Sequence, residues 1–230
     1  MFIQPPFGLS IQELIAAALR EDRGDGDHTS LATIEAGLVG RAEVKMKENG
    51  VISGIEFARE ICRLVDPSVT MAVFKNEGDA VNSGDIILEL KGQFLSLLLA
   101  ERLLLNCMQR MSGIATLTSK FVQAVHDTGA RILDTRKTTP NFRMFEKWAV
   151  QSGGGMNHRF GLYDMILIKD NHVDAAKGIE SAILKANDYL KRTGKVLKIE
   201  IEIRNMNELN QALQAGQIHR IMLIISILWT

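Results

Sequence analysis

The chain has 230 residues, 46% of them hydrophobic and 23% charged, so it can bury one large core or two smaller ones. Its 27 Lys and Arg residues balance its 27 Asp and Glu residues, which argues against a dedicated nucleic-acid-binding protein. No apolar run approaches the roughly 18 residues of a membrane span, and the first residues, MFIQPPFGLS, lack the basic start of a signal peptide. We therefore expect a soluble cytoplasmic protein with no membrane partner.

The two cysteines, Cys62 and Cys107, form no CxxC pair, and both lie among apolar neighbours. Because that pattern is typical of buried free thiols, we expect a reducing compartment rather than a disulfide. This expectation agrees with a cytoplasmic location.

The first 92 residues predict a small α+β unit. Ser10 and Glu13 form a capping box, which predicts a helix over 11–21. The acidic, glycine-containing stretch 21–30 after it is expected to be a loop. Residues 41–47 alternate apolar and charged side chains, which indicates a half-buried strand. The other expected elements are a helix over 54–66 and strands over 69–74 and 85–90.

After residue 92 the pattern changes to long helices and apolar strands. A strongly apolar helix is expected from residue 94, with an interruption around Ser112 and Gly113. Beyond it, strand and helix signals alternate, and the strands are nearly continuous apolar runs, as in a sheet covered on both faces. This alternation predicts an α/β fold with a parallel sheet, open or closed into a barrel. The strands are expected over 131–135, 164–169, 197–203 and 220–225, and the helices over 141–151, 174–192 and 206–214.

Polar and charged residues lie at or near the ends of these strands, and the carboxyl ends of parallel strands are where α/β folds bind their ligands. They are Arg136, Lys137, Thr138 and Thr139 after the first strand, Lys169 to His172 after the second, Glu200 and Glu202 in the third, and His158 and Arg159 in the glycine-rich stretch 152–161. A single charged strand end is more often a solvated loop. Three successive strands with such ends favour a shared rim.

Five cations gathered on one rim would repel one another. Two cations about 4 Å apart repel by roughly 4 kcal/mol at an effective dielectric constant near 20. A ligand with several negative charges relieves this repulsion, because Arg offers a planar fork for carboxylate or phosphate and Lys offers a point charge. The sequence therefore predicts a site for a polyanion.

Other kinds of site fit the sequence less well. It contains neither G-x-G-x-x-G nor a P-loop motif, which argues against a dinucleotide site or a P-loop nucleotide site. His158 and His172 lack the spacing of supporting ligands, so no structural zinc site is expected. The run Gly153–Gly155 indicates a close approach of backbone to backbone or to a ligand.

Three stretches resemble a known enzyme family. They are DTRKTTP at 134–140, GGGMNHRFGLYDMILIKDNH at 153–172 and ERLLLNCMQRMSGIAT at 101–116. With these motifs the chain resembles the quinolinate phosphoribosyltransferases, also called carboxylating nicotinate-nucleotide pyrophosphorylases. The resemblance runs from about Ala18 to Met222.

The resemblance implies a dimeric enzyme with an N-terminal α/β sandwich domain over 1–110 and a β/α-barrel catalytic domain over 111–230. Family members transfer a phosphoribosyl group from phosphoribosyl pyrophosphate, carried with Mg²⁺, to quinolinate. They release pyrophosphate and carbon dioxide and leave nicotinate mononucleotide for NAD biosynthesis. A pyridine dicarboxylate and a polyphosphorylated sugar together match the expected polyanion.

The same resemblance assigns roles to individual residues. Contacts to quinolinate and the phosphoribosyl group are expected from Arg136, Lys137, His158, Arg159 and Lys169, with Thr138 in the same segment. Arg102 resembles the arginine that family members insert into the partner subunit's site. Glu202 matches the second acid of the family's E-x-E strand and is expected to help hold the ribose or its metal. The expected catalytic residues are Lys137, Lys169 and Glu202, and no residue is assigned as a dedicated metal ligand.

The chain departs from the family near its end. Where members carry an aspartate that contacts substrate, this sequence has Ile224 within IMLIISILWT, and it stops before they do. A truncated or frame-shifted tail would give this pattern. Two alternatives to an active transferase therefore stay open: a non-catalytic fragment that keeps the anion pocket and dimer surface, and a related pyrophosphorylase that uses another heterocycle.

Overall fold

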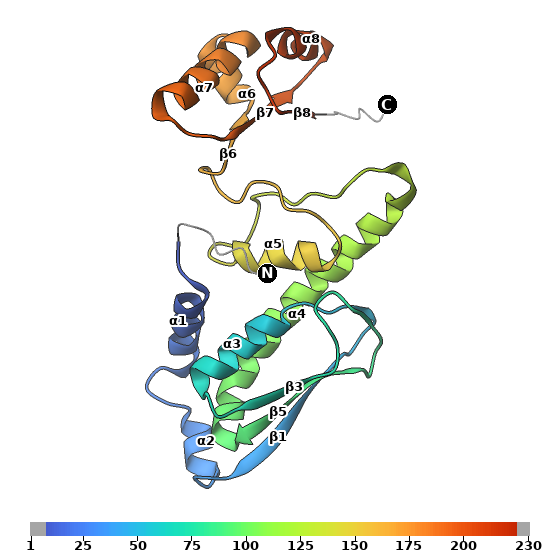
Figure 1. Ribbon diagram of the computed structural model, residues 1–230. Helices are drawn as coiled ribbons and strands as arrows, with labels where there is room; N and C mark the ends of the chain where they lie inside the picture. The colour runs from blue at the N-terminus through green and yellow to red at the C-terminus, as the bar shows by residue number, and fades with distance from the viewer. Residues whose placement is uncertain (1–7, 225–230) are drawn as a thin grey trace, which may run out of the picture. The chain divides into compact units, whose positions relative to one another are not determined.

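The computed structural model describes residues 8–224, which fold as two compact units that divide between His158 and Arg159 (Figure 1). The domain boundary expected after residue 110 lies inside a helix of the first unit, and it stays a prediction. Within residues 8–224, none of the helices combines the length and the apolar character that crossing a membrane requires.

The first unit is built on a three-stranded antiparallel sheet. In spatial order its strands are β1 (Val39–Lys45), β5 (Ile86–Gln93) and β3 (Thr70–Val73). Side chains of β1 alternate between exposed and half-buried, as its apolar and charged residues predict. A separate two-stranded ribbon pairs β2 (Gly50–Val51) with β4 (Ala80–Val81), and the sequence pattern does not predict it.

The predicted helices near the N-terminus are present. Helix α1 (Ile11–Arg23) begins at the capping box, in which the Ser10 amide donates to the Glu13 carboxylate at 2.7 Å and the Glu13 amide donates to the Ser10 hydroxyl at 3.2 Å. The helix expected over 54–66 is observed as α3 (Ile55–Val65).

The stretch 21–30 is not wholly a loop, because helix α2 (His28–Thr33) begins within it. The Asp27 carboxylate accepts a hydrogen bond from the Ser30 amide at 3.1 Å and so acts as the N-cap of α2. The prediction of a loop is therefore wrong at both ends of this stretch, because α1 continues to Arg23 and α2 begins at His28.

Helix α4 (Phe94–Ala124) runs without a break through Ser112 and Gly113, so the predicted interruption is wrong. The buried Ser112 hydroxyl accepts a hydrogen bond from the Ser53 amide at 3.0 Å and donates to the Ser53 carbonyl at 3.2 Å. A glycine inside a helix costs about 1 kcal/mol relative to alanine. The packing of α4 against α3, the strands and helix α5 (Arg143–Ser152) outweighs that local cost.

Glu77 connects the start of α3 to the end of α5. Its carboxylate accepts hydrogen bonds from the Ser53 hydroxyl (2.5 Å), the Gly54 amide (2.8 Å), the Ile55 amide (3.0 Å) and the Ser152 hydroxyl (2.9 Å). The N-cap residue of α3 is Gly54, which has no side chain to accept these donors. A carboxylate distant in sequence therefore caps α3 and holds the last turn of α5.

The core of the first unit contains aromatic contacts and both cysteines. The ring of Phe145 packs against those of Phe57 and Phe142, with centroids 4.2 and 4.8 Å apart. Cys62 and Cys107 are buried and free, which confirms the prediction of buried free thiols. Burial raises the pKa of Cys62 to about 11 and that of Cys107 to about 12, so both thiols stay protonated near neutral pH.

The second unit is a three-stranded parallel sheet with helices, as the alternating pattern predicts. In spatial order its strands are β6 (Met165–Ile168), β7 (Lys198–Ile203) and β8 (Arg220–Leu223). The helices are α6 (Asp170–Ala176), α7 (Ile179–Thr193) and α8 (Met206–Ala215). Ile183, Ile199 and Ile201 are fully buried in its core. Residue 225, the end of the last predicted strand, lies outside the described residues.

Two predictions beyond α4 are wrong. The single helix expected over 174–192 is two helices, because Lys177 and Gly178 take positive φ values of 67° and 134° between α6 and α7. The strand expected over 131–135 is not part of a sheet and makes only a parallel bridge between Leu133 and Met156. Leu133 is exposed, so this apolar run does not have the burial that a sheet strand would need.

Candidate functional site

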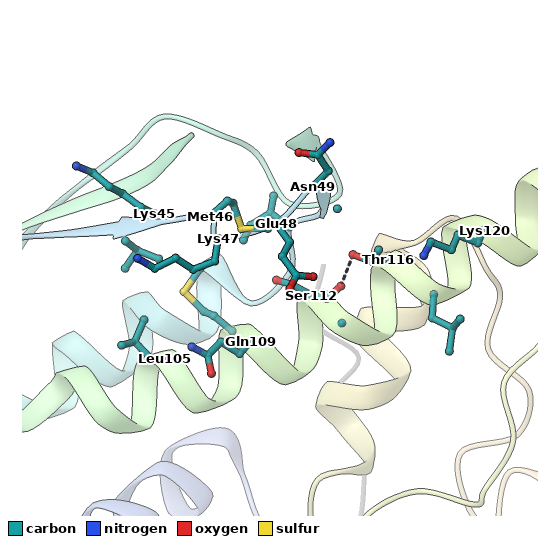
Figure 2. A pocket seen from close by; sticks show the side chains of 16 residues that line it. Lys45, Met46, Lys47, Glu48, Asn49, Leu105, Gln109, Ser112, Thr116 and Lys120 are labelled. Carbon is teal, nitrogen blue, oxygen red and sulfur yellow. Dashed lines mark hydrogen bonds between the residues drawn. The ribbon is translucent and has the colours of Figure 1, made fainter. Parts of the chain in front are cut away.

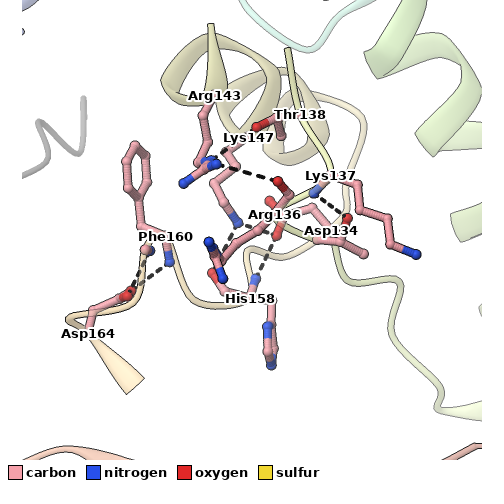
Figure 3. A network of polar contacts seen from close by, with 11 residues as sticks. Asp134, Arg136, Lys137, Thr138, Arg143, Lys147, His158, Phe160 and Asp164 are labelled. Atoms are coloured by element: carbon pink, nitrogen blue, oxygen red, sulfur yellow. Dashed lines mark hydrogen bonds and ion pairs between the residues drawn. The ribbon is translucent and has the colours of Figure 1, made fainter. Parts of the chain in front are cut away.

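The cationic segment 136–139 is held by side chains of α5 (Figure 3). The Arg143 guanidinium donates to the Thr138 hydroxyl at 3.0 Å and to the Arg136 carbonyl at 3.5 Å. The Lys137 amide donates to the Thr135 hydroxyl at 3.0 Å, while the Lys137 side chain is exposed. The segment is therefore held by hydrogen bonds to its backbone and to the Thr138 hydroxyl.

Glu146, one turn after Arg143 on α5, binds the end of the same segment. Its carboxylate accepts a 2.8 Å hydrogen bond from Nε of Arg110 on α4 and a 3.2 Å hydrogen bond from the Thr139 amide. The Arg110 guanidinium also donates to the Thr139 hydroxyl at 2.6 Å. Burial alone would raise the pKa of Glu146, but the hydrogen bonds from Arg110 and Thr139 lower it below its ordinary value.

Lys147 and Asp134 form a buried ion pair next to this segment, with Nζ and Oδ1 2.5 Å apart. Their side chains are only 2% and 6% exposed. Both residues also bind the backbone of His158. Lys147 donates to the His158 carbonyl at 3.2 Å, and the His158 amide donates to the Asp134 carboxylate at 2.8 Å. Burial raises the pKa of Asp134 above its ordinary value, against the lowering effect of Lys147 and of the His158 amide.

The glycine run before His158 allows the chain to leave α5 in a tight turn. A Cβ atom on Gly153 would lie 2.3 Å from the Ala115 carbonyl oxygen, and one on Gly155 would lie 2.7 Å from a methyl group of Val150. Only glycine fits at this separation, which confirms the predicted close approach of backbone to backbone. The turn delivers Met156 to its bridge with Leu133.

The predicted site residues of the second unit lie next to β6, with Lys169 after its end and Arg159 bound to its first residue. Lys169 follows this strand, and its ammonium nitrogen lies 3.3 Å from a carboxylate oxygen of Glu202 on β7. Arg159 is nearly buried and donates to the Met165 carbonyl at 3.3 Å. His172 has a local role, because its Nδ1 accepts the Lys169 amide hydrogen at 2.9 Å and caps α6.

Other charged residues near the ends of β7 and β8 form pairs within the second unit. The fully buried Glu200 accepts a 3.0 Å hydrogen bond from Arg220. Arg204 pairs with Glu208 at 2.7 Å and with Asp174 at 3.2 Å, and these hydrogen bonds raise the pKa of its guanidinium. Arg204 and Glu200 therefore bind partners inside the fold.

The structure brings the predicted residues together in two groups. Arg136, Lys137, Thr138 and His158 belong to the first unit, where His158 binds the Asp134–Lys147 pair, and Arg159, Lys169 and Glu202 belong to the second unit. That the two groups share one rim stays a prediction. Arg102 is exposed on α4. Ile224 is 44% exposed and donates its amide hydrogen to the Ile203 carbonyl, so a hydrocarbon side chain occupies the position where an acid was expected.

Sequence reasoning missed the residues that hold the cationic segment and the backbone of His158. These are Arg110, Asp134, Arg143, Glu146 and Lys147. Three of them lie at positions i, i+3 and i+4 of α5, so they share one face of that helix. This spacing was a usable signal, but charges on a helix face are more often solvated than buried.

A groove of about 390 Å³ lies between the end of β1 and helix α4 (Figure 2). It combines apolar side chains such as Met108 and Leu117 with Lys47 and Lys120. The Thr116 hydroxyl in its wall donates to the Ser112 carbonyl at 2.7 Å, so this polar group is already paired. The groove contains none of the residues predicted to bind substrate.

Two protein-family models match the chain. The N-terminal domain of quinolinate phosphoribosyl transferase matches residues 27–112, and the C-terminal domain of the same family matches residues 114–224. These matches confirm the predicted two-domain α/β fold.

Curated relatives carry the names of this activity. Quinolinate phosphoribosyltransferase (decarboxylating) 1b of Nicotiana tabacum is 44% identical over 205 residues, which cover 89% of this chain and 58% of that protein. The probable nicotinate-nucleotide pyrophosphorylase (carboxylating) of Bacillus subtilis is 42% identical over 208 residues, which cover 90% of this chain and 71% of that protein. The chain thus spans little more than half the length of the tobacco relative.

Solved structures share the fold. The crystal structure of NadC from Streptococcus pyogenes matches with a TM-score of 0.87 and 39% identity, over 94% of this chain and 76% of that one. The nicotinate-nucleotide pyrophosphorylase from Francisella tularensis matches with a TM-score of 0.86 and 37% identity, over 93% and 74% of the two chains. The chain belongs to the quinolinate phosphoribosyltransferase family, as its motifs predict.

Proposed function

We propose that the protein transfers a phosphoribosyl group from phosphoribosyl pyrophosphate to quinolinate and decarboxylates the product. The products are nicotinate mononucleotide, pyrophosphate and carbon dioxide, and the reaction serves NAD biosynthesis. The chain's membership of the family supports this proposal. A cytoplasmic location is part of the proposal and is supported by the two free buried thiols.

The observation that carries the proposal is the excess of positive charge around the segment 136–139. Five cationic side chains lie in this region, and two of them pair with the carboxylates of Asp134 and Glu146. The cations are Arg110, Arg136, Lys137, Arg143 and Lys147. Among the described residues, Nε of Arg136 is a buried donor without a hydrogen-bond partner, which suits an acceptor on a bound anion. A polyanionic substrate would compensate this charge.

The proposed chemistry follows from positioning and electrostatics. The pyridine nitrogen of quinolinate attacks the ribosyl carbon, and the bond from that carbon to pyrophosphate breaks with its electron pair leaving on the pyrophosphate. The pyridinium ring then accepts the electrons of the neighbouring carbon–carboxylate bond as carbon dioxide leaves, and a proton takes the vacated ring position. No covalent enzyme intermediate is needed.

In this proposal Arg136, Lys137, His158 and Arg159 hold the carboxylate and phosphate groups. Lys169 follows β6, and Glu202 lies 3.3 Å from it, so the lysine supplies positive charge while the carboxylate can accept hydrogen bonds from the ribose hydroxyls. Lys137, Lys169 and Glu202 are the proposed catalytic residues.

Mg²⁺ is proposed to enter with the phosphoribosyl pyrophosphate and to neutralise the leaving pyrophosphate. Between residues 8 and 224, no group of three or more His, Cys, Asp or Glu side chains could hold a metal ion. In the proposal the ion is carried mainly by substrate phosphates, with Glu202 as the one acid assigned near the ribose.

A homodimer is also proposed, with Arg102 reaching the partner subunit's site. The exposure of Arg102 on α4 supports this role, because its side chain is available to another chain. Mixing a Lys137→Ala chain with an Arg102→Ala chain tests it. Restored activity in the mixture supports sharing between subunits, and activity no higher than that of the two variants alone contradicts it.

An assay with quinolinate, phosphoribosyl pyrophosphate and Mg²⁺ tests the function. Stoichiometric release of pyrophosphate and carbon dioxide supports it. Turnover with nicotinate instead of quinolinate would identify a related pyrophosphorylase, which remains the alternative reaction. Binding of quinolinate without turnover would identify a non-catalytic fragment.

A further inference from the structure

We propose that the buried Asp134–Lys147 ion pair positions the anion-binding residues without touching substrate. It sets the geometry of His158 on one side and of the segment beginning at Arg136 on the other. This inference deepens the proposed function and rests on it for its kinetic test. It concerns two residues to which neither motif resemblance nor charge pattern assigns a role.

The first argument is the way in which the pair holds His158. The amide hydrogen of His158 is donated to Asp134 at 2.8 Å, and the His158 carbonyl accepts from Lys147 at 3.2 Å. The two members of the pair are themselves joined at 2.5 Å (Figure 3). The amide and the carbonyl of His158 are thus both held by the same ion pair. The imidazole direction depends on this backbone.

The second argument is the connection to the cationic segment. Asp134 precedes Arg136 by two residues, and its own amide donates to the Met156 carbonyl at 3.1 Å. The Met156 amide donates to the Ile132 carbonyl at 2.9 Å. The backbone on either side of Asp134 is therefore joined to the segment that leads to His158, while the Asp134 carboxylate holds the His158 amide at the other end of that segment.

The third argument is burial. Side chains that are 2% and 6% exposed cannot bind a large substrate directly. A buried ion pair is also a poor source of stability, because apolar side chains of similar volume often replace such a pair without loss. Apolar side chains could not, however, bind the amide and the carbonyl of His158 at once. The acceptor of Asp134 and the donor of Lys147 are the groups that positioning the His158 backbone requires.

The test compares Asp134→Asn/Lys147→Met, which removes both charges together, with Lys75→Met/Asp85→Asn as a matched control. Lys75 and Asp85 form a 3.0 Å pair in the same unit. If either single variant of the buried pair fails to fold, the double variant still provides the measurement, because it leaves no unpaired buried charge. Circular dichroism and urea unfolding establish that each protein is folded.

Two readouts are expected to change together. Hydrogen exchange at the His158 amide becomes faster, because its acceptor is weakened. KM for quinolinate rises by about tenfold or more while kcat changes much less, since small misplacement of binding groups weakens binding and orientation. The control variant keeps the exchange rate and KM of the natural protein. Faster exchange with an unchanged KM would overturn the positioning role, and so would no change in either.

Calorimetric binding of phthalate, a benzene dicarboxylate without the attacking nitrogen, separates this inference from the proposed function. If the natural protein binds phthalate but does not turn over quinolinate, the proposed function fails and the inference is judged by phthalate affinity. An affinity about tenfold lower in the double variant then supports it, and an unchanged affinity overturns it. If the natural protein binds neither compound, both proposals are overturned.

Discussion

The ammonium nitrogen of Lys169 lies 3.3 Å from a carboxylate oxygen of Glu202, so the end of β6 is paired across to β7. The lysine side chain is 44% exposed and the glutamate side chain 12%. The lysine can therefore also bind an incoming anion while Glu202 stays in place.

Replacing Lys169 with Met is expected to lower kcat/KM by roughly 10- to 100-fold, because a hydrogen bond to a charged group contributes about 1.5–3 kcal/mol. The free energy of unfolding is expected to change by less than about 1 kcal/mol, since exposed ion pairs contribute little. Steady-state kinetics and urea unfolding of the same preparation measure both. Wild-type kinetics in this variant would remove Lys169 from the site.

Lys137→Ala is expected to reduce activity at least about tenfold with almost no effect on stability, because the side chain is exposed and the backbone amide makes the structural hydrogen bond to Thr135. Lys195→Ala, at an exposed loop lysine of the second unit, is the control. Equal activities of the two variants would show that Lys137 is a solvated loop charge.

Glu77→Gln is expected to lower the free energy of unfolding by about 1–3 kcal/mol, because an amide cannot accept on both sides from the donors of Ser53, Gly54, Ile55 and Ser152. Urea unfolding at neutral pH measures the change. Glu35→Gln is the control, since Glu35 is exposed. If Glu77→Gln lowers the free energy of unfolding no more than the control does, water rather than Glu77 satisfies the amides of the first turn of α3.

The Arg110–Glu146 contact predicts a dependence of stability on pH. The folded-state pKa of Glu146 is below its ordinary value of 4.5, so its ionised form stabilises the fold above pH 4.5 and this contribution is lost as the pH falls through the lower folded pKa. Glu146→Gln should therefore melt at a lower temperature than the natural protein at pH 7, and the difference should shrink below pH 4.5. A difference that is constant with pH would contradict the assignment.

Two glycines offer a paired test of close packing. Gly153→Ala is expected to cost about 1–3 kcal/mol or more, because its Cβ would lie 2.3 Å from the Ala115 carbonyl. Gly113→Ala is expected to stabilise by about 0.5–1 kcal/mol, because it lies inside α4 and its Cβ would meet no atom within 4 Å. Thermal unfolding measures both changes, and equal effects would contradict the tight turn after α5.

Local signals predicted much of the fold because they act over a few residues. The capping box of Ser10 and Glu13 started α1 as expected, and the alternation in β1 matched its burial. The parallel βα pattern after residue 164 was also confirmed. In each case the side-chain pattern and the tertiary contacts favour the same structure.

The errors arose where distant contacts decide the structure. Ser112 looked like a helix break, but its hydroxyl binds the backbone of Ser53. The run 131–135 looked like a buried strand, yet its partner is a single bridge to Met156. The motif identified the cations Arg136 and Lys137, whereas the contacts of Arg143 and Glu146 with this segment depend on the packing of α5.

The continuity of α4 has a consequence for how the protein could be divided. The two family domain models meet between residues 112 and 114, in the middle of a single 31-residue helix. A helix of this length is a rod of about 46 Å, and cutting it there would expose apolar faces on both pieces. Neither half is therefore expected to fold as a soluble fragment on its own. A chimera that combines one half with another protein would need to include the whole of α4.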